Sequence, residues 1–207
     1  MVDELVLVLS KGLEPGRAKT RLIPACGEAG ADAVHRQLLA ATLRHAVASG
    51  RPVQCHLDGD RRQAAAALAV PDVGWRPQAD GDLGWRMQQA LASAHAAGAS
   101  RVVLVGSDCA ALTTAYLARA FDALTRYDFV FGPAEDGGYV LIGSALPSPW
   151  CGAPVFTGCR FGGGDALADS LQCLAPHGRI AQLDTLWDVD DAASLARARH
   201  AGYLPPE

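Results

Sequence analysis

The stretch from Arg101 to Cys109 restricts the possible folds most strongly. Residues Val102 to Val105 are consecutive, apolar and mostly β-branched. A short, wholly apolar run of this kind is typical of a strand buried on both faces, as in a parallel sheet. Ligands of open α/β sheets bind beyond the carboxyl ends of the strands. Asp108 is therefore a candidate metal ligand or nucleophile. Alternatively, Ser107 or Asp108 starts or caps a helix that we expect to begin near Thr113.

Other apolar runs predict that strands and helices alternate along the chain, which favours one α/β domain over residues 1–207. The expected strands cover residues 5–9, 53–57, 75–78, 102–105, 128–131, 139–143 and 179–183. The expected helices cover about residues 29–49, 60–69, 82–94, 113–126, 165–174 and 192–200. Residues 144–164 are rich in proline and glycine, and we interpret them as a flap over the site.

Composition narrows the possible partners. Eighteen basic and 22 acidic residues give a net charge of -4, which predicts no general affinity for nucleic acid. The apolar runs are too short for a membrane span, and the amino terminus does not resemble a signal peptide. Six cysteines without a C-x-x-C pair argue against a zinc knuckle. They favour a reducing, cytoplasmic setting with thiols as small apolar residues, although Cys109 is an alternative candidate for a reactive thiol.

The loop from Ser10 to Arg21 follows the first expected strand. It contains two glycines, a proline and four cations. Exposed backbone N–H groups together with lysine and arginine are what a nucleotide-phosphate site requires. The order of residues matches neither a Walker loop nor G-x-G-x-x-G. A solvated basic loop is the alternative interpretation.

A second candidate segment runs from Gln78 to Met87. Gly81 permits a tight turn, and the Gln78 amide together with this turn could hold a nucleobase or a ribose. Asp82 is also a good helix N-cap, which is the structural alternative.

Two acidic segments complete the set of candidates. Glu135-Asp136-Gly137-Gly138 lies between two apolar runs, either as a hairpin turn or as a place where backbone approaches a small polar ligand. Asp188 and Asp190 form a D-x-D, which points both carboxylates to one side if the chain is extended, and Mg²⁺ prefers such oxygen ligands. Asp190 could instead cap the last helix. Together with the basic loop and Asp108, these carboxylates suit a metal-bridged nucleotide.

Five segments then resemble one protein family. They are P-G-R-A-K-T-R-L (15–22), G-D-L-G-x-R-M (81–87), V-G-S-D-C (105–109), G-P-A-E-D-G-G-Y (132–139) and D-V-D (188–190). The chain resembles the DUF2064 proteins, small bacterial proteins of the nucleotide-diphospho-sugar transferase (GT-A) fold that are described as glycosyltransferases. These are similar to the 2-phospho-lactate guanylyltransferases. The resemblance implies a Rossmann-like, three-layer α/β/α sandwich around a mostly parallel sheet.

The resemblance also implies roles for particular residues. Lys19 and Asp108 would be catalytic, and Asp108, Asp188 and Asp190 would hold Mg²⁺ or Mn²⁺. The nucleotide would contact Lys11, Gly16, Arg17, Lys19, Thr20, Arg21, Gln78, Gly81 and Asp82. The acceptor would contact Glu135, Asp136, Gly137, Gly138 and Tyr139. In three places the chain differs from the family pattern: Trp85, Ala110 and the flap segment Phe161-Gly162-Gly163.

We therefore expect a metal-dependent transferase that uses a nucleoside triphosphate or a nucleotide-sugar, acting most simply by nucleotidyl transfer to a small phosphorylated or hydroxyl acceptor. The alternatives are glycosyl transfer from a nucleotide-sugar and a nucleotide-binding domain without catalysis, which the altered flap suggests. A phosphohydrolase with Asp108 as its nucleophile is a weaker alternative, because the first strand ends in Ser10-Lys11 rather than D-x-D. We expect a monomer or a homodimer, with no nucleic-acid or membrane partner.

Overall fold

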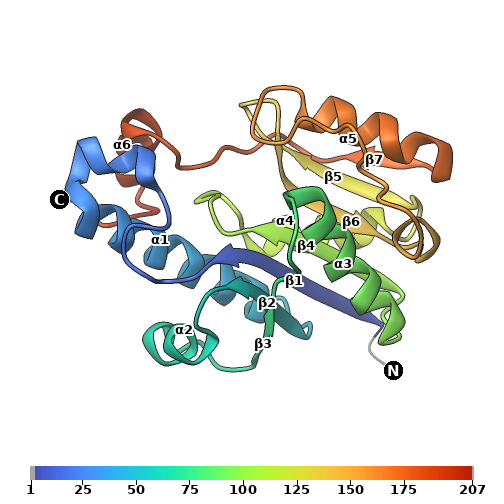
Figure 1. The fold of residues 1–207 in the computed structure, drawn as a ribbon, viewed down its shortest axis with the longest axis horizontal. Helices are drawn as coiled ribbons and strands as arrows, with labels where there is room; N and C mark the ends of the chain where they lie inside the picture. The colour runs from blue at the N-terminus through green and yellow to red at the C-terminus, as the bar shows by residue number, and fades with distance from the viewer. Residues whose placement is uncertain (1–2, 207) are drawn as a thin grey trace.

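A seven-stranded sheet forms the centre of the computed structural model, which describes residues 3–206 (Figure 1). The strand order is β3-β2-β1-β4-β6-β5-β7. The strands are β1 (Glu4–Lys11), β2 (Val53–Asp58), β3 (Val73–Pro77), β4 (Arg101–Gly106), β5 (Phe129–Pro133), β6 (Tyr139–Ser144) and β7 (Ile180–Gln182). Neighbouring strands pair in parallel except at β6, which runs antiparallel to both β4 and β5. The expected mostly parallel α/β sheet is confirmed.

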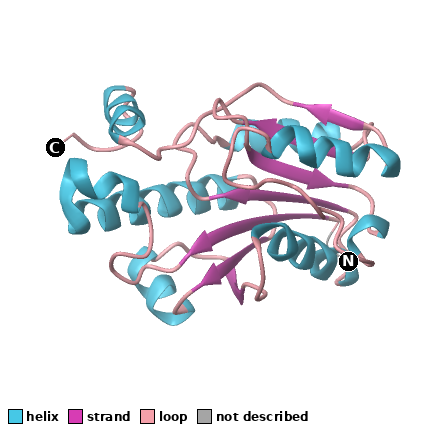
Figure 2. Ribbon diagram, turned by 45° about the horizontal axis from the view of Figure 1, so that its top comes forward, coloured by secondary structure: helices cyan, strands magenta, loops and turns pink. Residues whose placement is uncertain are grey.

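Helices cover both faces of this sheet, which makes the three expected layers (Figure 2). Helices α1 (Ile23–Ala48), α2 (Arg61–Leu68) and α4 (Thr114–Ala123) pack on one face. Helices α3 (Leu83–Ala96) and α5 (Ala166–Leu174) pack on the other. The last helix, α6 (Ala192–His200), lies against α1 at one end of the molecule (Figure 1).

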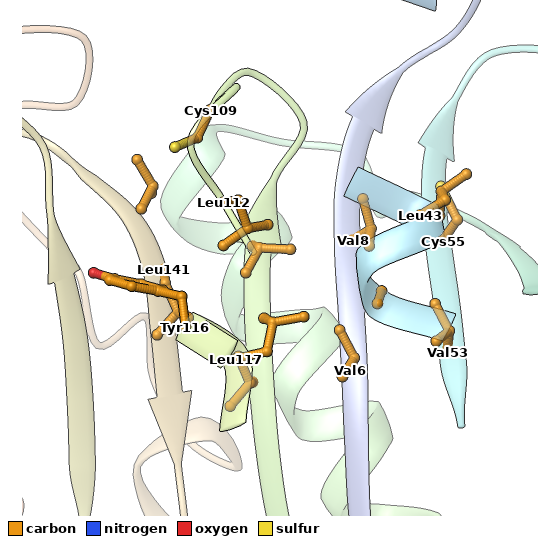
Figure 3. Packing of buried hydrophobic residues seen from close by; sticks show 14 of the residues in the cluster. Val6, Val8, Leu43, Val53, Cys55, Cys109, Leu112, Tyr116, Leu117 and Leu141 are labelled. Atoms are coloured by element: carbon orange, nitrogen blue, oxygen red, sulfur yellow. The ribbon is translucent and has the colours of Figure 1, made fainter. Parts of the chain in front are cut away.

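Strand burial follows from the apolar runs. In β1 and β4, successive side chains point to opposite faces, so Val6 and Val8 enter the core beneath α1 while Leu5 and Leu7 enter the core beneath α3. Figure 3 shows the first of these cores, with Val6 beside Val53 of β2 and Val8 beside Cys55 of β2 and Leu43 of α1. Helices cover both faces of the sheet at these strands and keep water away. For this reason the strands lack the alternation of apolar and polar residues.

The antiparallel strand β6 brings the acidic E-D-G-G segment to the edge where the parallel strands end. This segment is the turn between β5 and β6, closed by a hydrogen bond from the Gly137 N–H to the Ala134 carbonyl. The hairpin interpretation is therefore confirmed. Since β5 ends at this edge and β6 begins there, the turn lies at the same edge as Asp108.

The observed helix caps settle three of the capping alternatives that the sequence leaves open. Asp82 does cap α3, because its carboxylate accepts from the Trp85 N–H at 2.8 Å. Thr113 caps α4, so Ser107 and Asp108 do not have that role. Asp191, not Asp190, caps α6 in a reciprocal capping box with Ser194.

Helix α1 starts earlier than the sequence predicts. We expect its first residue near 29, whereas the structure begins the helix at Ile23 and kinks it at Gly27, which has φ 70°. The glycine allows a left-handed backbone at the kink, so a short leading helix joins the long one. None of the helices within residues 3–206 has the length and apolar character that a bilayer-spanning segment requires.

Candidate functional site

A cavity of about 710 Å³ opens at the carboxyl ends of β1 and β4. This volume lies within the range of small-molecule sites. Twelve of the predicted site residues line it: Lys11, Lys19, Thr20, Arg21, Gln78, Gly81, Asp108, Asp136, Gly138, Tyr139, Asp188 and Asp190. Five others lie beside the cavity without forming its wall: Gly16, Arg17, Asp82, Glu135 and Gly137. Segments far apart in the sequence thus meet at one place, as the sequence predicts.

Lys19 lies at the centre of the charged end of this cavity. Its side chain is only 4% exposed, and its Nζ lies 3.0 Å from Asp108 Oδ1 and 2.8 Å from Asp190 Oδ1. The Lys19 backbone is left-handed, with φ 52°, immediately before the short helical turn Thr20–Leu22. A buried ammonium requires paired carboxylates, and here two carboxylates from different elements supply the pairing.

Asp190 and Asp188 reach this position because the chain before α6 runs past the end of β4. The Val189 N–H donates to the Asp108 carbonyl at 2.9 Å, and the Val189 side chain is buried against α1 and α6. Since Val189 points into this core, its two neighbours point the other way, toward the cavity. Both carboxylates of the D-x-D therefore lie on the cavity side of this segment.

The pKa of the Asp188 carboxyl group lies far above its usual value. Burial, the largest cause, and the nearby carboxylates of Asp108 and Asp190 together raise its pKa to about 7, against the opposing effect of Lys19. A further positive charge would stabilise the ionised form of such a carboxyl group. Strongly shifted groups in a cleft are typical of functional sites.

The three aspartates have the chemistry that hard divalent cations prefer, with oxygen donors on two separate segments. As they stand, the ammonium of Lys19 lies between two of them. Correspondingly, no group of three or more His, Cys, Asp or Glu side chains within residues 3–206 is arranged to hold a metal ion. The carboxylate oxygens are therefore of the kind that a hard divalent cation prefers, while in this arrangement Lys19 supplies the positive charge between them.

Some cations of the basic loop face the cavity, whereas one is held in ion pairs elsewhere. Arg21 lines the cavity and has no ion-pair partner among residues 3–206, and Lys11 donates only to the Arg17 carbonyl. Arg17 is paired with Glu14 and Asp58 outside the cavity. The Gly16 N–H donates to Asp32, so it is not available to a phosphate in this arrangement. Of the loop cations, Lys11, Lys19 and Arg21 face the cavity.

The Gln78 side chain is engaged within the protein. Its Nε2 donates to the Ser10 carbonyl at 2.6 Å and to the His56 carbonyl at 3.1 Å, while its Oε1 accepts from Arg86. Gln78 thereby connects the ends of β1 and β2 to the turn before α3. Its predicted contact with a base or ribose stays a prediction, and in this structure the amide holds the wall in place.

Within the E-D-G-G turn, the side chains face different ways. Glu135 forms a two-pronged ion pair with Arg197 of α6, at 2.7 and 3.0 Å. Asp136 lines the cavity and its Oδ1 accepts from the Gly138 N–H. Gly137 has φ 85°, and a Cβ there would collide with the Gly164 carbonyl of the flap. Asp136 and Tyr139 are thus the side chains of this segment that reach the cavity.

Sequence reasoning missed His35, which is buried in α1 and lines the cavity. Its Nε2 lies 3.2 Å from the carbonyls of both Lys11 and Gly12, so it fixes the start of the basic loop. Burial lowers its pKa, which favours the neutral ring. The only sequence signal is a histidine on the apolar face of a helix, which does not by itself indicate a site.

Two buried serines were also missed. Ser10 is the last residue but one of β1 and Ser107 follows β4. Their hydroxyl oxygens are 3.0 Å apart, and both serines line the cavity. Their shared position after apolar strands is a signal that could have found them. Cys109, in contrast, is buried, and burial raises its pKa to about 12, so the reactive-thiol alternative is not supported.

Comparison with known proteins gives relatives that share this arrangement of strands. A crystal structure from Desulfovibrio desulfuricans G20, provisionally described as a nucleotide-diphospho-sugar transferase, is 29% identical, with a TM-score of 0.87 over 98% of this chain and 88% of that chain. A nucleotidyl transfer protein from Methanothermobacter thermautotroptrophicus is 16% identical (TM-score 0.67, 96% of each chain). Rv0371c from Mycobacterium tuberculosis H37Rv, in complex with manganese, is 20% identical (TM-score 0.61, 94% of this chain and 97% of that chain).

The fold and the charged cavity define an α/β protein of the nucleotide-diphospho-sugar transferase type. A family model described as "Uncharacterized protein conserved in bacteria (DUF2064)" matches residues 39–162, more than half of the chain. The chain belongs to the DUF2064 family, as its motifs predict. No curated protein matches it by sequence.

Proposed function

We propose that this protein is a metal-dependent transferase that takes a nucleoside triphosphate or a nucleotide-sugar and transfers its nucleotidyl group to a small acceptor with a phosphate or hydroxyl group. One observation carries the proposal. The buried Lys19 ammonium lies within 3.0 Å of carboxylates from both Asp108 and Asp190, in a cavity that Arg21 also lines. Charges of both signs, arranged in this way, suit a metal and a chain of phosphates. The absence of a spanning helix within residues 3–206 and the free thiols agree with a cytoplasmic enzyme.

In nucleotidyl transfer, an acceptor oxygen forms a bond to the α-phosphorus while the bond from this phosphorus to the pyrophosphate oxygen breaks. Negative charge grows on the transferred and departing oxygens. Lys19 turns from the aspartates to these oxygens and stabilises the charge, and Lys11 and Arg21 hold the outer phosphates. Asp108, Asp188 and Asp190 would hold the divalent ion, which would supply positive charge against the phosphates.

Glycosyl transfer is the second candidate, because the relative from Desulfovibrio desulfuricans G20 is described as a nucleotide-diphospho-sugar transferase and is similar over nearly the whole chain. The same cations and carboxylates would then hold the diphosphate of a nucleotide-sugar. The products separate the two reactions. Nucleotidyl transfer releases pyrophosphate from a triphosphate, whereas glycosyl transfer releases a nucleoside diphosphate.

The first experiment measures binding of nucleoside triphosphates and nucleotide-sugars with Mg²⁺, with Mn²⁺ and with EDTA, followed by product analysis with a panel of acceptors. We expect nucleotide binding that requires the metal and is lost in Asp108→Asn. The control is Asp122→Asn, which changes an aspartate paired with Arg126 on the surface of α4. Metal-independent binding, or none, would contradict the proposal. Tight binding without product would favour a non-catalytic nucleotide-binding domain.

A further inference from the structure

Besides its charged end, the cavity has an apolar wall. Six residues form this wall: Leu83 and Met87 of α3, Leu104 of β4, Tyr139 and Ile142 of β6, and Phe161 of the flap. Met87, Leu104 and Ile142 belong to the core between the sheet and α3, so the cavity is cut into the top of this core. The proposed phosphate chemistry uses none of these side chains.

Polar side-chain atoms on this wall are already paired. The Tyr139 hydroxyl is the only one among the six residues, and it accepts from Ser170 Oγ at 3.2 Å and donates to Met87 Sδ at 3.8 Å. It has no further proton to offer. A ligand that rests on the apolar wall therefore meets carbon and sulfur rather than free hydrogen-bonding side chains.

Close packing holds the apolar wall in place. Phe161 packs edge-on against Phe156 at 5.8 Å between ring centroids, and it fits so closely over Gly84 that a Cβ there would lie 2.8 Å from the ring. Leu83 is 45% exposed, although leucine side chains gain stability from burial. Of the three large apolar side chains that are exposed within residues 3–206, Leu83 is the one that lines the cavity.

We propose that the acceptor has an apolar body, a hydrocarbon ring or a short alkyl chain, which packs on the apolar wall while its phosphate or hydroxyl group points to Lys19 and Arg21. This inference rests on the proposed function and names the class of its acceptor. A hexose on this wall would bury several hydroxyl groups against six side chains that offer no free hydrogen-bonding partner, and each unpaired hydroxyl costs binding energy. A nucleobase packed on the apolar wall would likewise leave the hydrogen-bonding groups of its edge without partners.

The test compares two monophosphates that share a six-membered ring and a phosphate, cyclohexyl phosphate and glucose 1-phosphate. Each is titrated calorimetrically into the protein with Mn²⁺, alone and with each of the four non-hydrolysable nucleoside triphosphate analogues. We expect cyclohexyl phosphate to bind at least ~10-fold more tightly, since a few methylene groups in an apolar pocket give discrimination of this order. Leu83→Gln and Phe161→Ala should each reduce this preference several-fold.

Tyr127→Gln is the matched control, because Tyr127 is also a large, exposed apolar side chain but lies outside the cavity. It should keep the full preference. Leu83→Gln changes an exposed residue, so its result does not depend on whether Phe161→Ala folds. All variants are checked by circular dichroism.

Three results would overturn the inference. Glucose 1-phosphate could bind as tightly as cyclohexyl phosphate, or the preference could survive both wall substitutions. Alternatively, the substitutions could weaken only nucleotide binding, which would place the nucleobase on the apolar wall. In each of these three cases the wild-type protein still binds a nucleotide in the presence of the metal. Failure of the proposed function looks different, because then no nucleotide binds with metal, whichever monophosphate the protein prefers.

Discussion

Lys19 is the residue on which the charged end of the cavity depends. Its left-handed backbone is uncommon for a residue with a side chain and costs about 1–2 kcal/mol. The turn is closed by a hydrogen bond from the Leu22 N–H to the Lys19 carbonyl at 2.8 Å. Strain of this kind persists where the surroundings hold it, and it is frequent at functional sites. Here the two carboxylates hold the ammonium.

Replacing Lys19 tests its role in the reaction. Lys19→Met keeps the length and removes the charge, and we expect turnover to fall by ~10²–10³, as for loss of one preorganised charge contact. Steady-state kinetics of pyrophosphate release would measure this. Arg126→Met, which removes a surface cation paired with Asp122, should leave the rate unchanged. Normal turnover in Lys19→Met would contradict its catalytic assignment.

Asp188 makes stability depend on pH in a defined direction. Its pKa is about 7 in the folded protein against 3.8 ordinarily, so between these values the folded state keeps a proton that the unfolded state has lost. Stability therefore falls as the pH rises from about 4 to about 7, and the penalty is constant above this range. In EDTA, Asp188→Asn should gain stability over the wild type progressively across this window.

Urea unfolding of both proteins between pH 4 and pH 8 would measure the effect. Burial lowers the pKa of His35, His56 and His95, which gives the opposite trend below pH 6.5. Both proteins contain these histidines, so the difference between the two proteins isolates Asp188. Asp122→Asn is the control. A difference that does not change with pH would show that Asp188 is an ordinary carboxyl group.

At the scale of elements, the flap is held against its neighbours by buried polar contacts at one end and by a close approach to Gly137 at the other. Gln88 of α3, 1% exposed, donates to the carbonyls of residues 150, 152 and 153 and accepts from the Val155 N–H at 2.8 Å. At the other end of the flap, Gly164 lies close against Gly137, and just beyond it the Leu167 N–H of α5 donates to the Gly137 carbonyl at 3.0 Å. The flap is therefore docked against both α3 and the E-D-G-G turn.

Gly137→Ala should undock this end of the flap. The new Cβ would meet the Gly164 carbonyl and would require a left-handed alanine, so we expect a loss of about 1–3 kcal/mol in stability. Chemical denaturation measures the loss, and limited proteolysis locates it at residues 157–164. Gly152→Ala is matched, because Gly152 also lies in the flap but a Cβ added there would meet no atom within 4 Å. Equal stability of the two variants would contradict the docking.

The sequence predicts the helices and strands better than it predicts the residues that cap the helices and the contacts between distant segments. Apolar runs such as Val102 to Val105 signal buried strands because both faces of this sheet are covered. Aspartates close to helix starts remain ambiguous, since Asp82, Asp190 and Asp191 all suit a cap by residue type and only the three-dimensional position separates them. The pairing of Glu135 with Arg197 joins distant segments, so nothing local indicates it.

At the scale of the whole molecule, ligand binding should appear as global stabilisation. A nucleotide with Mn²⁺ at a hundredfold excess over its Kd adds about 2.7 kcal/mol. For a chain of this length, each kcal/mol raises the Tm by about 2–4 °C, so we expect a rise of roughly 5–11 °C. Differential scanning calorimetry measures it, and Asp108→Asn should lose the metal-dependent part. A rise that is the same in EDTA would exclude a metal bridge.

The contact between Lys19 and Asp190 joins residues 171 positions apart. During synthesis, the chain emerges from the ribosome with its amino-terminal end first. The parallel strands β1 to β4 can pair while the segment with Asp190 is still being made, and until then Lys19 lacks one of its two carboxylates. The charged site is therefore completed only after Asp190 has been made, and a nascent chain stalled before residue 188 should form much of the sheet without a competent cavity.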